Sequence, residues 1–121
     1  MKYMLLIYGA ESCWTEQERR ECMIESMEIC ERLAAEGKLI ASAPLHSVST
    51  ATSLRVRDGK RLVTDGPFAE TKEFLAGYSM IEADSLDEAV RMAEAWPWSR
   101  YGAVEVRPVR DFDAVRRRVG A

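Results

Sequence analysis

The sequence has very little histidine and cysteine, with one His and three Cys among 121 residues. No Cys-x-x-Cys pair occurs, and an odd cysteine count argues against a disulfide framework. A single histidine also argues against a zinc site built from Cys and His ligands. The sequence contains no glycine-rich phosphate loop and no dinucleotide-binding fingerprint. We therefore expect neither a bound metal ion nor another cofactor.

Long apolar runs and an excess of positive charge are absent as well. The longest apolar run, residues 4–8, is much shorter than the ~20 residues of a membrane span. Seventeen Lys and Arg against 20 Asp and Glu give a net charge of −3, which argues against nucleic acid or an anionic membrane as partner. The N-terminus lacks the charged and apolar regions of a signal peptide. A soluble, cytoplasmic protein is the expectation.

The overall composition is typical of a single folded domain. Hydrophobic residues make up 47% and charged residues 31% of the chain, which excludes a disordered or low-complexity segment. A length of 121 residues matches the usual size of one domain. We expect the domain to cover residues 1–110, followed by a short C-terminal tail over residues 111–121 that contains a helical segment.

Two helices with capping boxes each lie between predicted strands. Thr15 with Glu18 opens a helix that ends at Gly37, and Ser85 with Glu88 opens a second one. The expected strands around them are residues 2–8, 39–43, 75–82 and 103–108. The expected buried stripes are Met23, Met27, Cys30, Leu33 and Ala34 on the first helix and Leu86, Ala89, Val90 and Ala93 on the second.

A hairpin is inserted between the two halves of this pattern. Asp58-Gly59 predicts a β-hairpin between residues 53–57 and 60–64. A two-residue turn would place Val56 opposite Arg61, whereas a bulged loop would place it opposite Leu62. Both registers remain open at this point.

The order of elements predicts an α+β fold, namely a ferredoxin-like split βαβ domain with an inserted β-hairpin. Both helices would cover the same face of the sheet. The first strand, residues 2–8, is apolar on both sides, so its second side also needs a cover. A second copy of the chain would supply it, giving a homodimer that encloses a barrel-like interior, a dimeric α/β barrel.

The run Asp65-Gly66-Pro67-Phe68 and the residues after it, up to Glu73, resemble the YCII-related family, and within it the subgroup marked by a DGPF motif. The resemblance continues in order over residues 1–8, 54–59, 76–78 and 104–108. It implies a ferredoxin-like fold and a dimeric α/β barrel. It also implies that some members are enzymes with a histidine–aspartate pair in a cleft, and that members of the subgroup are linked to alternative sigma factors. The family does not specify one reaction.

His46 and Asp65 are the candidate catalytic pair. An imidazole exchanges protons near neutral pH, and a neighbouring carboxylate would fix its tautomer and orientation. If Gly66 caps a short helical turn that runs from Pro67 to Glu73, Asp65 lies near the positive end of that turn and stays ionised. The alternatives are that His46 is an exposed loop residue and that Asp65 only caps the turn.

Four further residues are candidates for substrate binding. Arg107, on the last strand, would bind a carboxylate through two hydrogen bonds, or would form a structural ion pair. Glu70 and Thr71 follow the turn and would line the mouth of a polar pocket, unless they form a solvated surface. Tyr78 would line the same cavity or pack in the core.

Two function classes follow. The first is a cofactor-independent enzyme that acts on a small organic molecule in a cleft of the dimer, with His46 as general acid or base, Asp65 as its orienting partner and Arg107 as anion anchor. The second is a non-catalytic module that binds a ligand or a protein, for example in sigma-factor regulation. The enzyme requires the two catalytic side chains within hydrogen-bond reach, and the binding module requires only an apolar pocket or patch.

Overall fold

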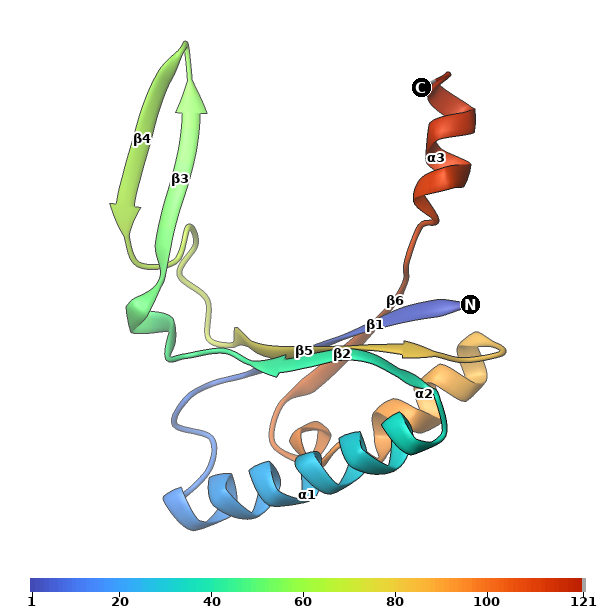
Figure 1. Cartoon of the computed structure of the whole chain (residues 1–121). Coiled ribbons are helices and arrows are strands. Elements are labelled where there is room, and N and C mark those ends of the chain that lie inside the picture. Colours follow the sequence, from blue (N-terminus) through green and yellow to red (C-terminus); the bar gives the residue numbers. More distant parts are fainter. Residues whose placement is uncertain (121) are drawn as a thin grey trace.

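A four-stranded antiparallel sheet forms the centre of the computed structural model, which describes residues 1–120 (Figure 1). Its strands lie in the order β2-β5-β1-β6. Their bounds are Lys2–Gly9 for β1, Leu39–Pro44 for β2, Phe74–Glu82 for β5 and Ala103–Pro108 for β6. Helix α1, Glu16–Ala35, joins β1 to β2, and helix α2, Leu86–Glu94, joins β5 to β6. Both helices lie on one face of the sheet, so the predicted α+β class and split βαβ order are confirmed.

The core lies between this face of the sheet and the two helices. Alternate residues of β1, namely Tyr3, Leu5 and Ile7, are buried there, because successive strand residues point to opposite faces. They pack with Ile81 of β5 and with Trp96, which is only 2% exposed. Helix α1 contributes Ile29 and Leu33 to this core, and α2 contributes Ala89 and Ala93. Met4, Leu6 and Tyr8 of β1 are half-buried on the opposite face.

Helix α1 begins with the predicted capping box, in which the Thr15 hydroxyl accepts from the Glu18 amide and the Glu18 carboxylate accepts from the Thr15 amide. The predicted buried stripe of this helix is partly wrong. Met27 is 56% exposed, and the buried positions are Cys22, Ile29 and Leu33. Met23 and Met27 line a cavity between α1 and the strands β2 and β5, so they do not pack in the core.

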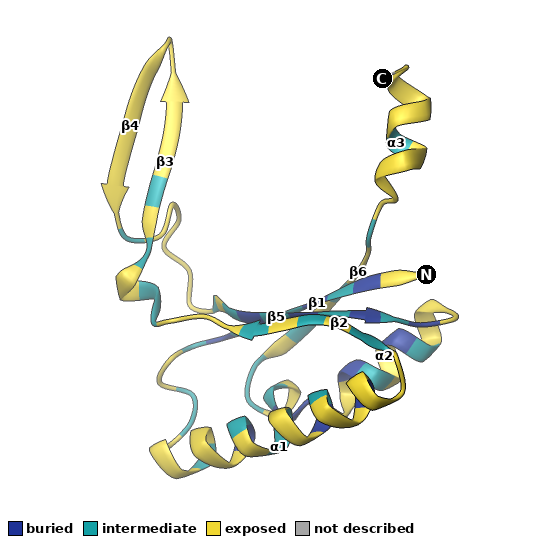
Figure 2. Cartoon of the chain, viewed as in Figure 1, coloured by how far each residue is buried: buried dark blue, intermediate teal, exposed yellow. Residues whose placement is uncertain are grey.

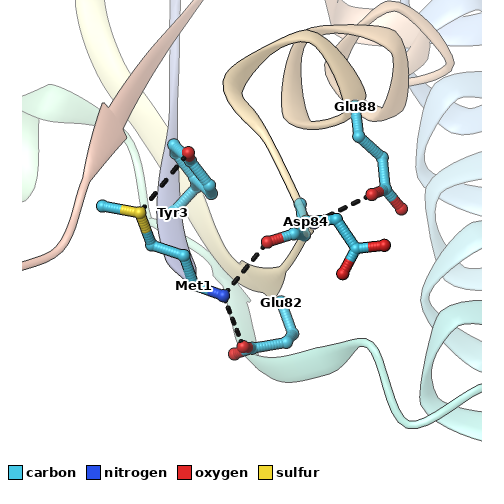
Figure 3. Close-up of polar contacts among 6 residues, drawn as sticks. Met1, Tyr3, Glu82, Asp84 and Glu88 are labelled. Atoms are coloured by element: carbon cyan, nitrogen blue, oxygen red, sulfur yellow. Dashed lines mark hydrogen bonds and ion pairs between the residues drawn. The ribbon is translucent and has the colours of Figure 1, made fainter.

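The N-terminus of α2 is held by a shifted version of the predicted capping box (Figure 3). The Ser85 hydroxyl accepts from the Glu88 amide, but the Glu88 carboxylate accepts from the amide of Asp84. The hydrogen bond from the Asp84 amide lowers the pKa of Glu88, and the charge of Lys38 lowers it further. Close by, the ammonium group of Met1 donates to the Glu82 carboxylate at 2.7 Å. The predicted stripe of α2 is half correct, because Leu86 and Val90 stay exposed.

The hairpin consists of β3, Thr52–Arg57, and β4, Lys60–Asp65. Val56 pairs with Arg61, which is the register of the two-residue turn and not that of the bulged loop. Asp58 and Gly59 take φ values of 53° and 72°, the left-handed conformations that this kind of turn requires.

The helical turn predicted after Asp65 is wrong, because residues 66–73 form bends without a helix. Gly66 takes a φ of 98°, which lies outside the helical region. Its amide donates to the Ala51 carbonyl at 2.7 Å, and its own carbonyl accepts from the Ser53 hydroxyl. These contacts tie Gly66 to the base of the hairpin.

The hairpin and helix α3, Phe112–Val119, both project from the face of the sheet that α1 and α2 leave open (Figure 1). Figure 2 shows both of them almost wholly exposed, in contrast to the strands and helices around the core. Two short 3-10 helices complete the described fold, one at Val48–Thr50 and one at Pro97–Arg100. Within residues 1–120, no helix has the length and apolar character that a membrane crossing needs.

Candidate functional site

A cavity of about 720 Å³ lies between α1 and the β2–β5 edge of the sheet. Its walls come from the loop after β1, from α1, from β2 and the loop that follows it, and from β5. Lining side chains with apolar character include Ile7, Met23, Met27, Leu39, Leu75 and Trp96. Those that carry polar groups include Glu11, Arg19, Ser26, Ser42 and His46. An apolar cavity with a few convergent polar groups is the usual form of a small-molecule site.

Helix α1 supplies one long wall of the cavity through Arg19, Met23, Ser26 and Cys30. Their spacing of four, three and four residues places them in one row along the helix, and this row is about 16 Å long. The methionines and Cys30, predicted as buried core, thus face the cavity instead. At the Cys30 end, the Cys30 thiol lies 3.6 Å from the Ser42 hydroxyl, which lies 2.7 Å from the Ser79 hydroxyl.

Aromatic side chains gather at the other end of the cavity, before α1 begins. The rings of Trp14 and Trp98 meet edge to face with their centroids 4.7 Å apart, and Tyr101 lies 6.4 Å from Trp14. Trp14 also lies directly over Gly9, where an added Cβ would be 3.1 Å from its ring. All three tryptophans of the chain line the cavity.

His46, the one histidine of the chain, lies at this cavity in the loop after β2. The backbone is fixed on both sides of it. The Leu45 amide donates to the Ala76 carbonyl at 2.8 Å, and the Val48 amide donates to the Glu11 carboxylate at 2.7 Å. The Ser47 hydroxyl also donates to Glu11. Glu11 therefore holds the His46 loop against the loop after β1.

The pKa of Glu11 is lowered, chiefly by the hydrogen bond from the Val48 amide and then by that from the Ser47 hydroxyl. A lowered pKa means that this contact is fully present above the ordinary range of a glutamate and is lost as the pH falls through the lowered value.

Replacing Glu11 by glutamine is expected to speed hydrogen exchange of the Val48 amide at neutral pH by about threefold to tenfold, because the amide loses a charged acceptor. Amide exchange followed by NMR measures this directly. Glu28→Gln changes an exposed glutamate on α1 and should leave the exchange rate of the Val48 amide unchanged. Equal exchange in Glu11→Gln and the unmodified chain would contradict the role of Glu11.

Of the site residues predicted from sequence, His46 and Tyr78 are among the lining residues of the cavity, although the Tyr78 side chain lies on the open face of the sheet beside Leu6. Asp65 is the last residue of β4, is exposed, and pairs with Thr52 across the hairpin. Asp65 is not among the lining residues, and within residues 1–120 no hydrogen bond or ion pair joins it to His46.

The other three predicted residues lie outside the cavity. Glu70 and Thr71 are exposed in the segment between β4 and β5, where the Thr71 hydroxyl donates to the Glu73 carbonyl. Arg107 lies on β6, at the sheet edge opposite β2, and forms a 3.7 Å ion pair with Glu105. This contact joins two residues of the same strand, and the pairing of Arg107 across a dimer interface stays a prediction.

The cysteines do not form a reactive centre. Burial raises the pKa of the Cys13 thiol and of the Cys22 thiol, which favours the unreactive protonated form. All three cysteines are free. Cys30 contributes its side chain to the cavity wall.

Sequence reasoning missed Trp14, Arg19 and Ser26. The signal was present in the helix period, because Arg19, Met23, Ser26 and Cys30 repeat every three or four residues. A stripe that mixes an arginine and a serine with apolar residues is typical of a cavity wall and less so of a core. Trp14 lies before the helix and has no periodic neighbours from which its position could be inferred.

Comparison with known proteins places this geometry in a family. The model of the YCII-related domain matches residues 1–113. The chain belongs to the YCII-related family. An uncharacterized protein of Rhizobium meliloti is 38% identical over 116 residues, which span 90% of this chain and 92% of that protein.

A solved structure supports the YCII-related fold. The 5-chloro-2-hydroxyhydroquinone dehydrochlorinase of Burkholderia phenoliruptrix, in complex with 2,5-dihydroxybenzoquinone, matches with a TM-score of 0.55 and 18% sequence identity. The match covers 91% of this chain and 94% of that one. At this identity the likeness shows a common fold.

Proposed function

We propose that this YCII-related protein binds a small ring-shaped organic molecule in the cavity between α1 and the β2–β5 edge, and that His46 exchanges a proton with it. The observation that carries the proposal is that the only histidine of the sequence lines the same cavity as the three tryptophans. Apolar walls would hold the ring, and the fixed backbone on both sides of His46 would keep the imidazole in place.

The residues of the cavity wall narrow the chemical class of the ligand. Met23, Met27 and the tryptophans present polarisable apolar surfaces that suit a planar ring. The structural neighbour was solved with a hydroxylated quinone, which makes 2,5-dihydroxybenzoquinone a suitable first probe. Its ring C–H groups can exchange with solvent through its tautomers, so a general acid or base beside the ring should accelerate that exchange.

The test combines binding with proton exchange. The three tryptophan indole N–H signals and the single histidine signal in NMR spectra all report on this cavity. We expect 2,5-dihydroxybenzoquinone to shift them and the protein to accelerate deuterium uptake at its ring carbons. His46→Asn should retain binding within about threefold and lose most of the acceleration, about a hundredfold, because general acid–base catalysis commonly contributes that much.

Each outcome has a meaning for the function. Binding without accelerated exchange would favour the alternative, a non-catalytic ligand-binding module. Absence of binding by this and other ring compounds would overturn the proposal.

The partnership of His46 with Asp65 stays a prediction, and Asp65→Asn tests it. If the two act together, this change should shift the pH profile of the exchange, and an unmoved profile would show that His46 acts without Asp65.

We also propose that the functional unit is a homodimer. Met4, Leu6 and Met80 are half-buried on the sheet face that α1 and α2 leave open. The hairpin and α3 rise on this same side and leave it accessible (Figure 1). A two-stranded hairpin is marginally stable alone in water, so contact with a second chain would stabilise it. Two sheets packed through these faces would form the dimeric α/β barrel predicted from the sequence.

A further inference from the structure

Arg19 is a charged side chain at the cavity with no partner of its own. Its guanidinium carbon lies 5.9 Å from the centroid of the Trp14 ring, a cation–π distance. In the described part of the chain, its side chain makes no hydrogen bond and no ion pair. Arginine presents five N–H donors in a planar fork, so this exposed guanidinium lies over the Trp14 ring with donors that no protein group accepts from.

Neither of the two acidic side chains on the cavity wall forms an ion pair with Arg19. Glu11 is close enough for the charge of Arg19 to lower its pKa further, but its carboxylate already accepts from Ser47 and Val48. Glu31, the other acid on the cavity wall, lies 12 residues further along α1, about 18 Å away along the axis. An additional anion at the Trp14 end would therefore meet an arginine with free donors.

We infer that the cavity selects ring compounds that carry an anionic oxygen, with a carboxylate or phenolate on Arg19 and the ring between Met23 and the Trp14–Trp98 pair. A carboxylate would accept two parallel hydrogen bonds from the guanidinium, which fixes the orientation of the ring. His46 and Arg19 line the same cavity, so the anchored ring would be presented to the imidazole. This inference rests on the proposed function, because it names the ligand class of the same cavity.

The test compares 2-naphthoate with its neutral isostere 2-naphthamide by calorimetric titration of the full chain. We expect the carboxylate to bind at least about tenfold more tightly, the usual effect of a charge-assisted hydrogen bond. Arg19→Gln should abolish this preference and leave 2-naphthamide binding within about twofold. Arg19→Lys should retain part of the preference, because lysine keeps the charge but lacks the fork.

Arg20→Gln is the matched control, since Arg20 is the neighbouring exposed arginine of α1 and does not line the cavity. This variant should keep the full preference, and its loss in both variants would mean that only the general charge matters. Equal binding of the two compounds by the unmodified chain would overturn the anion anchor and leave the ring-binding function intact. Failure of both compounds and of 2,5-dihydroxybenzoquinone to bind would overturn the function and the inference together.

Discussion

Replacing Gly102 by alanine is expected to destabilise the fold by about 3 kcal/mol or more, a large share of the ~5–15 kcal/mol that a domain of this size usually has. An alanine Cβ at this position would lie 2.0 Å from the Tyr8 carbonyl oxygen and 3.0 Å from the Gly9 Cα atom. Both belong to the backbone of the central strand β1, which cannot turn aside as a flexible side chain would. The free energy of unfolding in urea measures the loss.

Gly37→Ala is the control for this prediction. Gly37 takes a φ of 72° after α1, and no atom lies within 4 Å of an added Cβ. The change should therefore cost only the strain of a left-handed residue, about 1 kcal/mol. If the two alanine variants unfold at the same urea concentration, the close approach of Gly102 to β1 is not the cause of the lost stability. If only Gly102→Ala fails to give soluble protein, that result agrees with the prediction.

Much of the fold could be predicted because its signals are local. Thr15 and Glu18 start α1, and Asp58-Gly59 forms the two-residue turn, since capping and turn geometry depend on a few neighbouring residues. The turn after Asp65 could not be predicted in this way. The left-handed Gly66 is tied to Ala51 and Ser53, contacts that exist only after the hairpin has formed.

The candidate site was predictable only in part for a related reason. His46 stood out as a single imidazole, but the cavity that it lines is formed by the packing of α1 against β2 and β5, which periodicity does not reveal. Met23, Met27 and Cys30 are apolar at helical spacing, and the sequence cannot distinguish a stripe that meets a sheet from one that lines a cavity. Arg107 was expected as the anion anchor, whereas Arg19 is the arginine at the cavity.

The second prediction with a large expected effect tests the proposed homodimer. Leu6→Arg is expected to weaken self-association by about a thousandfold, because a large charged side chain would replace an apolar one in the middle of the interface and would have to be desolvated there. Leu6 lies in the middle of the open face, between Tyr78 of β5 and Glu105 of β6. In a single chain the new arginine would reach water, so the circular dichroism spectrum should stay unchanged. Sedimentation analysis over a range of concentrations measures the dissociation constant.

Ile24→Arg provides the matched control, because Ile24 is 43% exposed on α1 and does not line the cavity. This variant should sediment like the unmodified chain. An unmodified chain that stays monomeric at high concentration would refute the dimer, and a Leu6→Arg chain that still dimerises would place the interface elsewhere.

The cavity lies on the helix-covered side of the sheet, so a monomeric Leu6→Arg chain should still bind 2-naphthoate if α1, β2 and β5 suffice to build the site. Loss of binding together with dimerisation would instead mean that the second chain completes the site.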